Sequence, residues 1–181
     1  MSKSAGQIYQ ELQERFPGKI KGADLEALDP FIIVEADSIA EVAAWLRDEP
    51  EMAFDMLHCL SGVDYPKDEK MEVVYHLFSL RKRHWIVLKV ELPRDGAVVP
   101  TVENVWKTAN WHERETYDLY GIRFEGHSDL RRIFLPDDWE GHPLRKEWEW
   151  PAEWHGIPVK AGKSLAARAE EGEDIGVGPF D

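Results

Sequence analysis

Hydrophobic positions near the start of the chain recur with the period of a helix. Apolar residues stand four apart at Ile8, Leu12 and Phe16, and a Pro-Gly pair follows them. Ser4 and Gln7 precede this run with the spacing of a capping box, in which each side chain bonds the backbone N–H of the other residue. The pattern therefore predicts an amphipathic helix that begins after Ser4 and ends at the Pro-Gly pair.

The next ninety positions mix the helical period with the alternation of strands. A run of β-branched residues predicts a strand, and a Ser-x-x-Glu cap and an i, i+3, i+4, i+7 spacing predict two helices. Two longer apolar runs are joined by the turn Arg-Lys-Arg, which indicates an antiparallel hairpin. We expect strands over residues 31–36, 71–80 and 84–93, and helices over 38–50 and 53–62.

Shorter elements follow as far as residue 135. The apolar spacing predicts helices over 101–109 and 110–121, and short strands over 122–124 and 130–135. Helices and strands are mixed without a strict βαβ alternation. The fold class predicted for residues 1–135 is therefore α+β, a two-layer domain with a mixed β-sheet and helices packed on it.

Periodicity ends after residue 135. Residues 136–159 contain four prolines and four tryptophans, which is typical of extended chain without a core of its own. Residues 160–181 are rich in alanine, glycine and glutamate, and we expect an acidic, mobile tail. The expected organisation is a domain over 1–135, an extended partner-binding segment over 136–159 and the tail over 160–181.

Charge and cysteine content narrow the class of protein. The net charge of −13 repels phosphate backbones and anionic lipid, so we expect no nucleic-acid partner and no direct binding to a lipid surface. The one cysteine, Cys59, cannot close an internal disulfide or supply four thiolates to an iron–sulfur cluster. Neither a membrane-spanning run nor a signal-peptide hydrophobic region occurs, which favours a soluble, cytoplasmic protein.

The sequence WHERETYDLYG is the richest candidate for chemistry. His112 and Glu115 stand three apart, and Asp118 lies on the same helical face, which is a spacing suited to metal ligands. Glu113 and Glu115 can instead be residues of a first helical turn, where the helix dipole favours carboxylates. Arg114 and Asp118 would then form an i, i+4 pair worth about 0.3–0.5 kcal/mol. We favour this second interpretation because the sequence indicates no further ligand.

Other titratable residues lie in the predicted loops. His127, His142 and His155 each neighbour a glycine, but their spacing matches no zinc-ligand pattern. Asp137 and Asp138 could act as general acid and base, although adjacent carboxylates after a proline more often cap a turn. The chain also lacks the glycine-rich phosphate loops and the nucleophile motifs of nucleotide and acyl-transfer enzymes. We predict no catalytic residue from these groups.

Tryptophan and arginine concentrate in the aperiodic segment and just before it. These two residue types dominate binding hot spots, because each brings a large area or paired hydrogen bonds at small entropic cost. Large apolar side chains such as Trp139, Leu144 and Trp148 are expected to be buried, either against the chain's own sheet or against the surface of a partner.

Residues 113–148 closely resemble the signature of the C subunit of the proton-pumping NADH–quinone oxidoreductase, respiratory complex I. Two departures are Ser128, where the family usually has a proline, and the sequence EWEWPAEW after Lys146. The matching residues are Glu113, Arg114, Glu115, Tyr117, Asp118, Gly121, Ile122, Gly126, His127, Leu130, Arg131, Arg132, Ile133 and all of 136–146.

The resemblance implies a non-catalytic subunit of the hydrophilic arm, peripheral to the cell membrane on its cytoplasmic side. It implies that this chain holds no cofactor, and that other subunits bind FMN, the iron–sulfur clusters and the quinone. The C-terminal segment is expected to lie on the D subunit, which helps to form the quinone site, with the B and I subunits as further neighbours. The expected interface residues are Arg131, Arg132, Trp139, His142, Leu144, Arg145, Lys146 and Trp148.

Three other interpretations stay open at this point. The chain can be the equivalent subunit of a ferredoxin- or deazaflavin-fed quinone reductase or of a membrane-bound hydrogenase. It can be a small metalloenzyme that uses His112, Glu115, Asp118 and a loop histidine. It can also be an aromatic-rich module that binds a peptide or a sugar.

Overall fold

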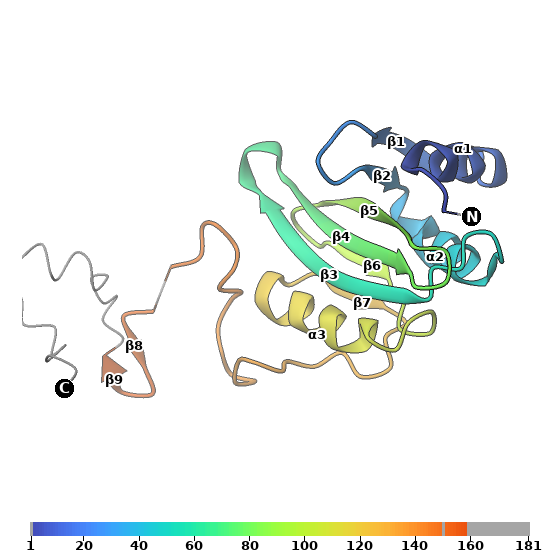
Figure 1. Cartoon of the computed structure of the whole chain (residues 1–181). Helices are drawn as coiled ribbons and strands as arrows, with labels where there is room; N and C mark the ends of the chain where they lie inside the picture. Colours follow the sequence, from blue (N-terminus) through green and yellow to red (C-terminus); the bar gives the residue numbers. More distant parts are fainter. Residues whose placement is uncertain (1, 150, 159–181) are drawn as a thin grey trace, which may run out of the picture. The chain divides into compact units, whose positions relative to one another are not determined.

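A mixed five-stranded sheet forms the centre of the domain (Figure 1). The computed structural model describes residues 2–149 and 151–158. The strand order is β1-β2-β5-β4-β3, in which β2 and β5 run parallel and every other neighbouring pair is antiparallel. The strands are β1 (Ile20–Asp24), β2 (Phe31–Val34), β3 (Met56–Tyr65), β4 (Lys70–Ser79) and β5 (His84–Pro93).

Helices and a second small sheet form the other layer. In the described residues the α-helices are α1 (Ala5–Arg15), α2 (Ile39–Asp48) and α3 (Ala109–Tyr120). Short 3₁₀ turns occur at η1 (Ala36–Ser38) and η2 (Pro66–Asp68). The strands β6 (Val98–Pro100) and β7 (Arg123–Glu125) pair in parallel on either side of α3 in the sequence.

One face of the five-stranded sheet builds the core. The core residues of β4 are Met71, Val73, Tyr75 and Leu77, and those of β5 are Ile86, Leu88, Val90 and Leu92. They alternate along each strand, and they pack with Ile8 and Leu12 of α1 and with residues of α2 and α3. Phe78 and Trp85 point to the opposite face and are not part of this core. The predicted fold class, a two-layer α+β domain with a mixed sheet, is confirmed.

The first helix and the central hairpin agree with the sequence pattern. Ser4 and Gln7 form the capping box of α1, with the Gln7 N–H donating to Ser4 Oγ at 3.3 Å and the Ser4 N–H donating to Gln7 Oε1 at 2.9 Å. The strands β4 and β5 form the predicted antiparallel hairpin. The predicted side-chain cap of α2 is wrong, because the turn η1 leads directly into this helix and Ser38 caps no backbone N–H.

The helix predicted over residues 53–62 is wrong, since this part of the chain is mostly strand β3. Ala53 adopts a positive φ of 47°, which a helix does not allow. From Met56 the backbone pairs with β4, and after a register shift between Leu57 and Cys59 its burial alternates as a strand requires. A short apolar run is compatible with the period of a helix and with that of a strand. The pairing with β4 therefore determines that this run is a strand. Strand β1 was not predicted at all.

Two further elements differ from the prediction. Residues 101–109 form turns rather than a helix up to the start of α3, with Val102 and Trp106 buried in the core. Residues 130–135 form no strand, because the backbone N–H groups of residues 133–135 bond a side chain of α3. The predicted helix over 110–121 is confirmed as α3, which ends at Gly121 with a φ of +78°.

The chain divides into two compact units, Met1–Trp148 and Glu149–Asp181. This division differs from the predicted one at residue 135, because hydrogen bonds attach residues 142–146 to α3 and β3. In the second unit, β8 (Glu153–Trp154) and β9 (Ile157–Pro158) pair as a short hairpin. The predicted tail over 160–181 lies outside the described residues. No helix among residues 2–149 and 151–158 is long and apolar enough to cross a membrane.

Candidate functional site

Helix α3 carries an unusual number of charged side chains on its buried side. Glu113, Arg114 and Asp118 are each at most 5% exposed, and Glu113 and Asp118 are fully buried. The helix lies close to β3, because a Cβ built at Gly62 would stand 2.9 Å from Tyr120 and 3.0 Å from Thr116. A glycine in β3 therefore brings the helix and its charges against the sheet.

Asp118 binds the chain that follows α3. Its Oδ2 accepts the backbone N–H groups of Ile133, Phe134 and Leu135 at 3.0, 2.8 and 3.0 Å. Burial by itself would raise the pKa of Asp118, but these three bonds and the Arg132 guanidinium outweigh it and hold the pKa below its usual range. The residue is therefore an ionised carboxylate that fixes the loop over 133–135.

Arg132 extends this anchor to the next turn of the chain. Its Nη1 donates to Asp118 Oδ1 at 3.0 Å, and its Nη2 donates to the carbonyl oxygens of Trp139 and Gly141, both at 3.2 Å. The planar guanidinium suits this task because it presents several N–H donors in a fixed fork. The ion pair between the buried Asp118 and the partly buried Arg132 thus sets the path of the backbone from 132 to 141.

The last carbonyl groups of α3 are bonded by the same segment. These carbonyls have no partner within the helix itself. His142 Nδ1 contacts the Asp118 carbonyl oxygen at 2.9 Å, the Leu144 N–H donates to Leu119, and Arg145 Nε donates to Tyr120 at 2.8 Å. Residues 142–145 therefore act as the C-terminal cap of α3.

Gly121 and Asp64 secure the two ends of this cap. A Cβ at Gly121 would lie 2.5 Å from His142 Nε2, so only glycine leaves room for the imidazole. Asp64 of β3 accepts the Lys146 N–H at 2.9 Å and a bidentate pair from Arg94 at 2.7 and 3.0 Å. Arg94 also pairs with Glu147. The segment is thereby attached to the sheet as well as to α3.

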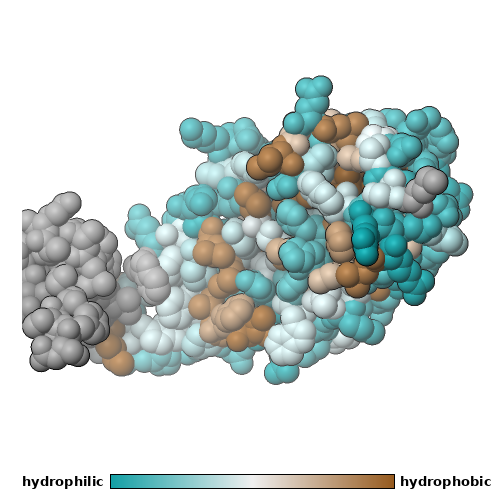
Figure 2. All heavy atoms as spheres, viewed as in Figure 1, coloured by the Kyte–Doolittle hydropathy of each residue, from teal (hydrophilic) through white to brown (hydrophobic). Residues whose placement is uncertain are grey.

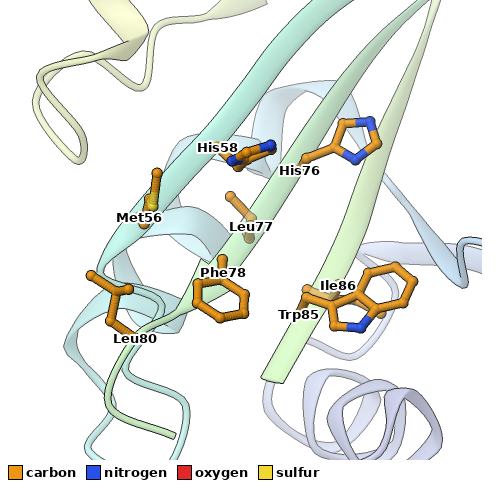
Figure 3. Close-up of a pocket in the computed structure, with 8 residues that line it drawn as sticks. All are labelled: Met56, His58, His76, Leu77, Phe78, Leu80, Trp85 and Ile86. Atoms are coloured by element: carbon orange, nitrogen blue, oxygen red, sulfur yellow. The ribbon is translucent and has the colours of Figure 1, made fainter. Parts of the chain in front are cut away.

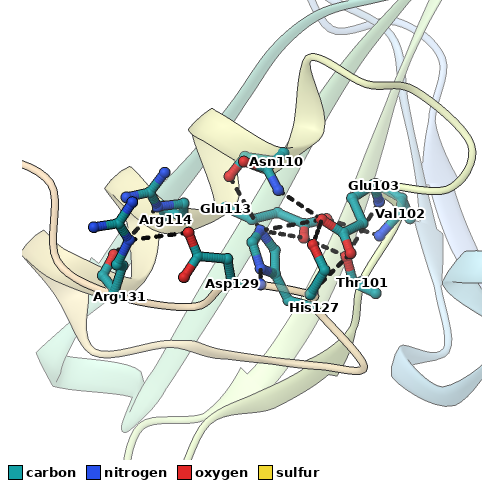
Figure 4. Close-up of polar contacts among 10 residues, drawn as sticks. Thr101, Val102, Glu103, Asn110, Glu113, Arg114, His127, Asp129 and Arg131 are labelled. Carbon is teal, nitrogen blue, oxygen red and sulfur yellow. Dashed lines mark hydrogen bonds and ion pairs between the residues drawn. The ribbon is translucent and has the colours of Figure 1, made fainter.

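A second polar cluster surrounds Glu113 (Figure 4). Glu113 accepts the hydroxyl of Thr101 and the N–H of Val102, the latter at 2.7 Å. Burial raises the pKa of Glu113 to about 7, although both hydrogen bonds act against the rise. The imidazole of His127 lies 3.9 Å from Glu113 Oε2 and 3.5 Å from Glu103 Oε2.

Glu103 links this cluster to the loop after β7. It accepts Asn110 Nδ2 at 2.7 Å, the Ser128 N–H at 2.7 Å and the Ser128 hydroxyl at 3.1 Å. Burial would raise the pKa of Glu103, but these bonds together lower it. Ser128 stands where the resembling family usually has a proline, which could donate neither bond.

Exposed apolar side chains lie on the same helix and segment. Trp111, Phe134 and Leu144 are 61, 62 and 45% exposed. The guanidinium carbon of Arg114 lies 4.8 Å from the centroid of the Trp111 ring, and Arg114 Nε donates to the carbonyl oxygen of Arg131. Figure 2 shows that hydrophobic residues gather in separate patches on the face in view.

The predicted interface residues divide into two groups. The side chains of Arg132, His142 and Arg145 bond backbone groups of the chain's own domain. Trp139 and Trp148 stack on each other with ring centroids 6.0 Å apart. By contrast, the exposed residues of the predicted set are Arg131, Leu144 and Lys146.

Two local predictions for α3 are corrected. Arg114 and Asp118 do not pair, because Arg132 takes the carboxylate of Asp118. Glu113 and Glu115 are not in the first turn, since α3 begins at Ala109 and its first turn has no acidic residue. In the part of the chain that the structure describes, no three His, Cys, Asp or Glu side chains could hold a metal ion together. His155, the remaining loop histidine, contacts the ring of Trp154.

Sequence reasoning missed several residues of the site. Thr101, Glu103 and Asp64 contribute to it from segments that carry no motif, and Trp111 and Phe134 were not assigned to a surface. The sequence carries a signal for only one of these residues. Asp64 is a charged residue at a position where the alternation of β3 points inward, which indicates a buried charge with a partner.

The comparisons with known proteins agree with the sequence signature. Residues 32–153 match the family model described as the 30 kDa subunit of respiratory-chain NADH dehydrogenase. The chain is 43% identical to the NADH-quinone oxidoreductase C subunit of Chlorobium phaeobacteroides over 87% of this chain and 96% of that protein. It is 44% identical to the C subunit of Roseiflexus sp. over 77% of this chain and 81% of that one.

Two solved structures share the fold. The trypsin-resistant fragment of Nqo5 is 29% identical, with a TM-score of 0.60, and the match covers 71% of this chain and all of the fragment. A chain of the membrane-bound sulfane sulfur reductase, an archaeal respiratory membrane complex, matches over 99% of this chain and 97% of its own length, with a TM-score of 0.68. At 22% identity, the second likeness shows the fold alone.

Proposed function

This chain belongs to the 30 kDa subunit family of respiratory-chain NADH dehydrogenase, and we propose that it scaffolds the quinone-site subunit of a proton-translocating NADH:quinone oxidoreductase. In this role the chain is a non-catalytic subunit of the hydrophilic arm. It is needed for assembly, and it supports the quinone-site D subunit while electrons pass from NADH to quinone. Neighbours such as the B and I subunits complete its surroundings.

The exposed surface around α3 supports this proposal best. Trp111, Phe134 and Leu144 expose large apolar area. Trp111 is part of α3, the Phe134 N–H donates to the Asp118 carboxylate, and the Leu144 N–H donates to the Leu119 carbonyl oxygen. Apolar area presented on a rigid support is typical of a protein interface, because little conformational freedom is lost on binding. We define these three residues, with Arg131, as the α3 surface.

The two groups of predicted interface residues then have different tasks. Arg132, His142 and Arg145 set the shape of the segment, whereas Leu144 and Arg131 are available to touch a partner. The contact with the partner then continues into the part of the predicted strap that carries the β8–β9 hairpin. Truncating a positioning residue would weaken assembly indirectly, by disordering the α3 surface.

The remaining parts of the proposal rest on the family. The chain lies on the cytoplasmic side of the cell membrane and reaches the membrane only through other subunits. FMN, the iron–sulfur clusters and the quinone are held elsewhere in the complex. The alternative, an equivalent subunit of a ferredoxin- or deazaflavin-fed quinone reductase or of a membrane-bound hydrogenase, is less favoured. Relatives at 40–47% identity are named as subunits of the NADH-dependent enzyme.

Charge introduced into the α3 surface tests the proposal. The chain is tagged in its native cells, and the detergent-solubilised complex is sized on a native gel stained for NADH dehydrogenase activity. We expect the wild-type chain in a particle of several hundred kilodaltons with NADH activity. Leu144→Asp and Phe134→Asp should each lower its recovery, because a hot-spot loss of about 2 kcal/mol weakens binding roughly thirtyfold.

Leu28→Asp is the matched control, since Leu28 is 96% exposed in the loop between β1 and β2 and should tolerate the charge. Equal recovery of all three variants would refute the scaffold role of the α3 surface. A large particle without NADH activity would instead favour the alternative electron donor. Circular dichroism of the purified variants checks that each one is folded.

A further inference from the structure

A second apolar surface lies on the side of the sheet that faces away from the core. Met56 of β3 stands opposite Phe78 of β4, and Phe78 stands opposite Trp85 of β5. The three side chains therefore form one row across neighbouring strands on the same face (Figure 3). None of them belongs to the hydrophobic core.

This row borders a cavity of about 410 Å³. Its lining includes Met56, His58, His76, Phe78, Leu80 and Trp85. Met56, Trp85 and Leu80 remain 39, 44 and 63% exposed, although methionine, tryptophan and leucine gain most from burial. A concave apolar site with a tryptophan at its edge is the usual form of a pocket that takes one large anchor side chain.

Basic residues stand beside this pocket in an otherwise acidic chain. The turn that joins β4 to β5 carries Arg81, Lys82 and Arg83 directly after Leu80 and shortly before Trp85. Lys82 pairs with Glu51 at 3.0 Å, whereas the contact of Arg81 with Asp55 is 3.9 Å long and Arg81 is 82% exposed. Arg83 is exposed as well, so two arginines are available to a ligand beside the apolar row.

We propose that this pocket binds an acidic segment of a neighbouring protein through one aromatic or aliphatic side chain. The anchor fills the space between Met56, Phe78 and Trp85, and carboxylates that flank it pair with Arg81 and Arg83. In the assembled enzyme the neighbour is another subunit, a point that rests on the proposed function. This pocket lies on the open face of the sheet, apart from the α3 surface.

Charge and shape favour this occupant over the other candidates. A second copy of the chain in a two-fold contact would bring the arginine turns of both copies together. A broad anionic lipid surface would be repelled by the chain's net charge of −13. A short segment interacts only with charges within a Debye length of about 8–10 Å, and here those include the arginines of the turn. An acidic segment with one hydrophobic anchor satisfies both the pocket and the turn.

Cysteine labelling in the assembled enzyme is the first test. Met56→Cys is introduced into a Cys59→Ser chain, and maleimide labelling of the isolated chain is compared with labelling of the purified complex. We expect at least tenfold slower labelling in the complex. Gln10→Cys, at an exposed position of α1, gives the control for general accessibility. Equal labelling of Cys-substituted position 56 in both forms would overturn the proposal.

Peptide binding to the full-length chain separates this proposal from the proposed function, because it needs no complex. The probe is a fluorescein-labelled peptide with one central phenylalanine between glutamates, followed by fluorescence anisotropy. We expect the peptide to bind, with an affinity that falls as the salt concentration rises. The affinity should also fall at least tenfold in Trp85→Ala and in the double variant Arg81→Glu/Arg83→Glu. Leu28→Ala, which removes an exposed apolar side chain outside both surfaces, should bind as the wild type does.

Four further results would overturn the proposal, and a fifth bears on the proposed function alone. Peptide binding that is unchanged in Trp85→Ala, or absent in the wild type, would overturn it. So would a concentration-dependent dimer that Trp85→Glu abolishes, since the occupant would then be a second copy. Binding to vesicles that contain phosphatidylglycerol, lost in Trp85→Ala, would identify a lipid surface instead. Failure of the chain to enter a large complex would refute the proposed function alone.

Discussion

Asp118→Asn is expected to destabilise the domain far more than its small change in shape suggests. The carboxylate is fully buried and accepts three backbone N–H groups as well as Arg132. Asparagine retains one acceptor oxygen and turns an NH₂ group towards donors that also carry hydrogens. The substitution therefore leaves N–H groups without an acceptor and a partly buried guanidinium without its counter-ion.

The expected loss follows from typical values for such groups. A hydrogen bond to a charged group contributes about 1.5–3 kcal/mol, and removing one partner of a buried ion pair costs about 3–5 kcal/mol. Because Arg132 retains two carbonyl acceptors, at Trp139 and Gly141, we expect the lower end, a loss of about 3 kcal/mol. Urea unfolding of the full-length chain, followed by tryptophan fluorescence, measures this loss as a change in midpoint at constant slope.

The pH dependence gives an independent check. The pKa of Asp118 is lowered in the folded state, so its contribution to stability is present above the unfolded-state pKa of about 3.9. That contribution is lost as the pH falls through the lower, folded-state pKa. The difference between wild type and Asp118→Asn should thus stay constant from about pH 5 to 8 and shrink in more acidic solution.

Glu115→Gln provides the control, because Glu115 is exposed on the same helix. Its effect should stay within about 0.5 kcal/mol, as for most surface substitutions. A loss below about 1 kcal/mol for Asp118→Asn, or a loss equal to that of the control, would refute the reasoning. It would mean that residues 133–141 hold their path without the carboxylate.

Two other substitutions address the second polar cluster and the end of α3. The pKa of Glu113 is raised to about 7, so burial of the charged form should lower stability by about 1.4 kcal/mol per pH unit between roughly pH 4.5 and 7. Glu113→Gln should remove this slope, so the stability of the variant relative to the wild type should be higher at pH 8 than at pH 4. Urea unfolding at several pH values measures this. The same pH dependence of the free energy of unfolding in both proteins would contradict it. Gly121→Ala should lower the free energy of unfolding by about 1–3 kcal/mol more than Gly18→Ala does. Both glycines have a positive φ, but only at Gly121 would the added Cβ collide with a neighbour, the imidazole of His142. Equal unfolding midpoints for the two alanine variants would show that the imidazole moves aside freely.

Local sequence patterns were sufficient for some elements and not for others. The capping box at Ser4 and the turn between β4 and β5 act over a few residues, and both were predicted correctly. The run from Ala53 to Leu60 satisfies helical and strand periods equally, and only pairing with β4 makes it a strand. The loop at 133–135 has the composition of a strand, but its N–H groups are taken by Asp118.

The candidate site shows the same division. The signature around Glu113 to Trp148 identified the family, because a long and dense match needs no knowledge of contacts. It could not distinguish the exposed residues of the predicted interface from residues that hold the chain in place. Arg132, His142 and Arg145 were predicted at an interface, yet their side chains bond backbone groups of their own domain.

The sequence by itself determined the fold class, the family and the position of the aromatic segment, since these follow from composition, period and motif. Tertiary structure alone decided which carboxylates are buried, that Thr101, Glu103 and His127 gather around Glu113, and that Met56, Phe78 and Trp85 form a row. The physical reason is that burial and hydrogen bonding depend on contacts between residues far apart in the chain. Such contacts leave no periodic signal in either partner's neighbourhood, so they become visible only when the chain is folded.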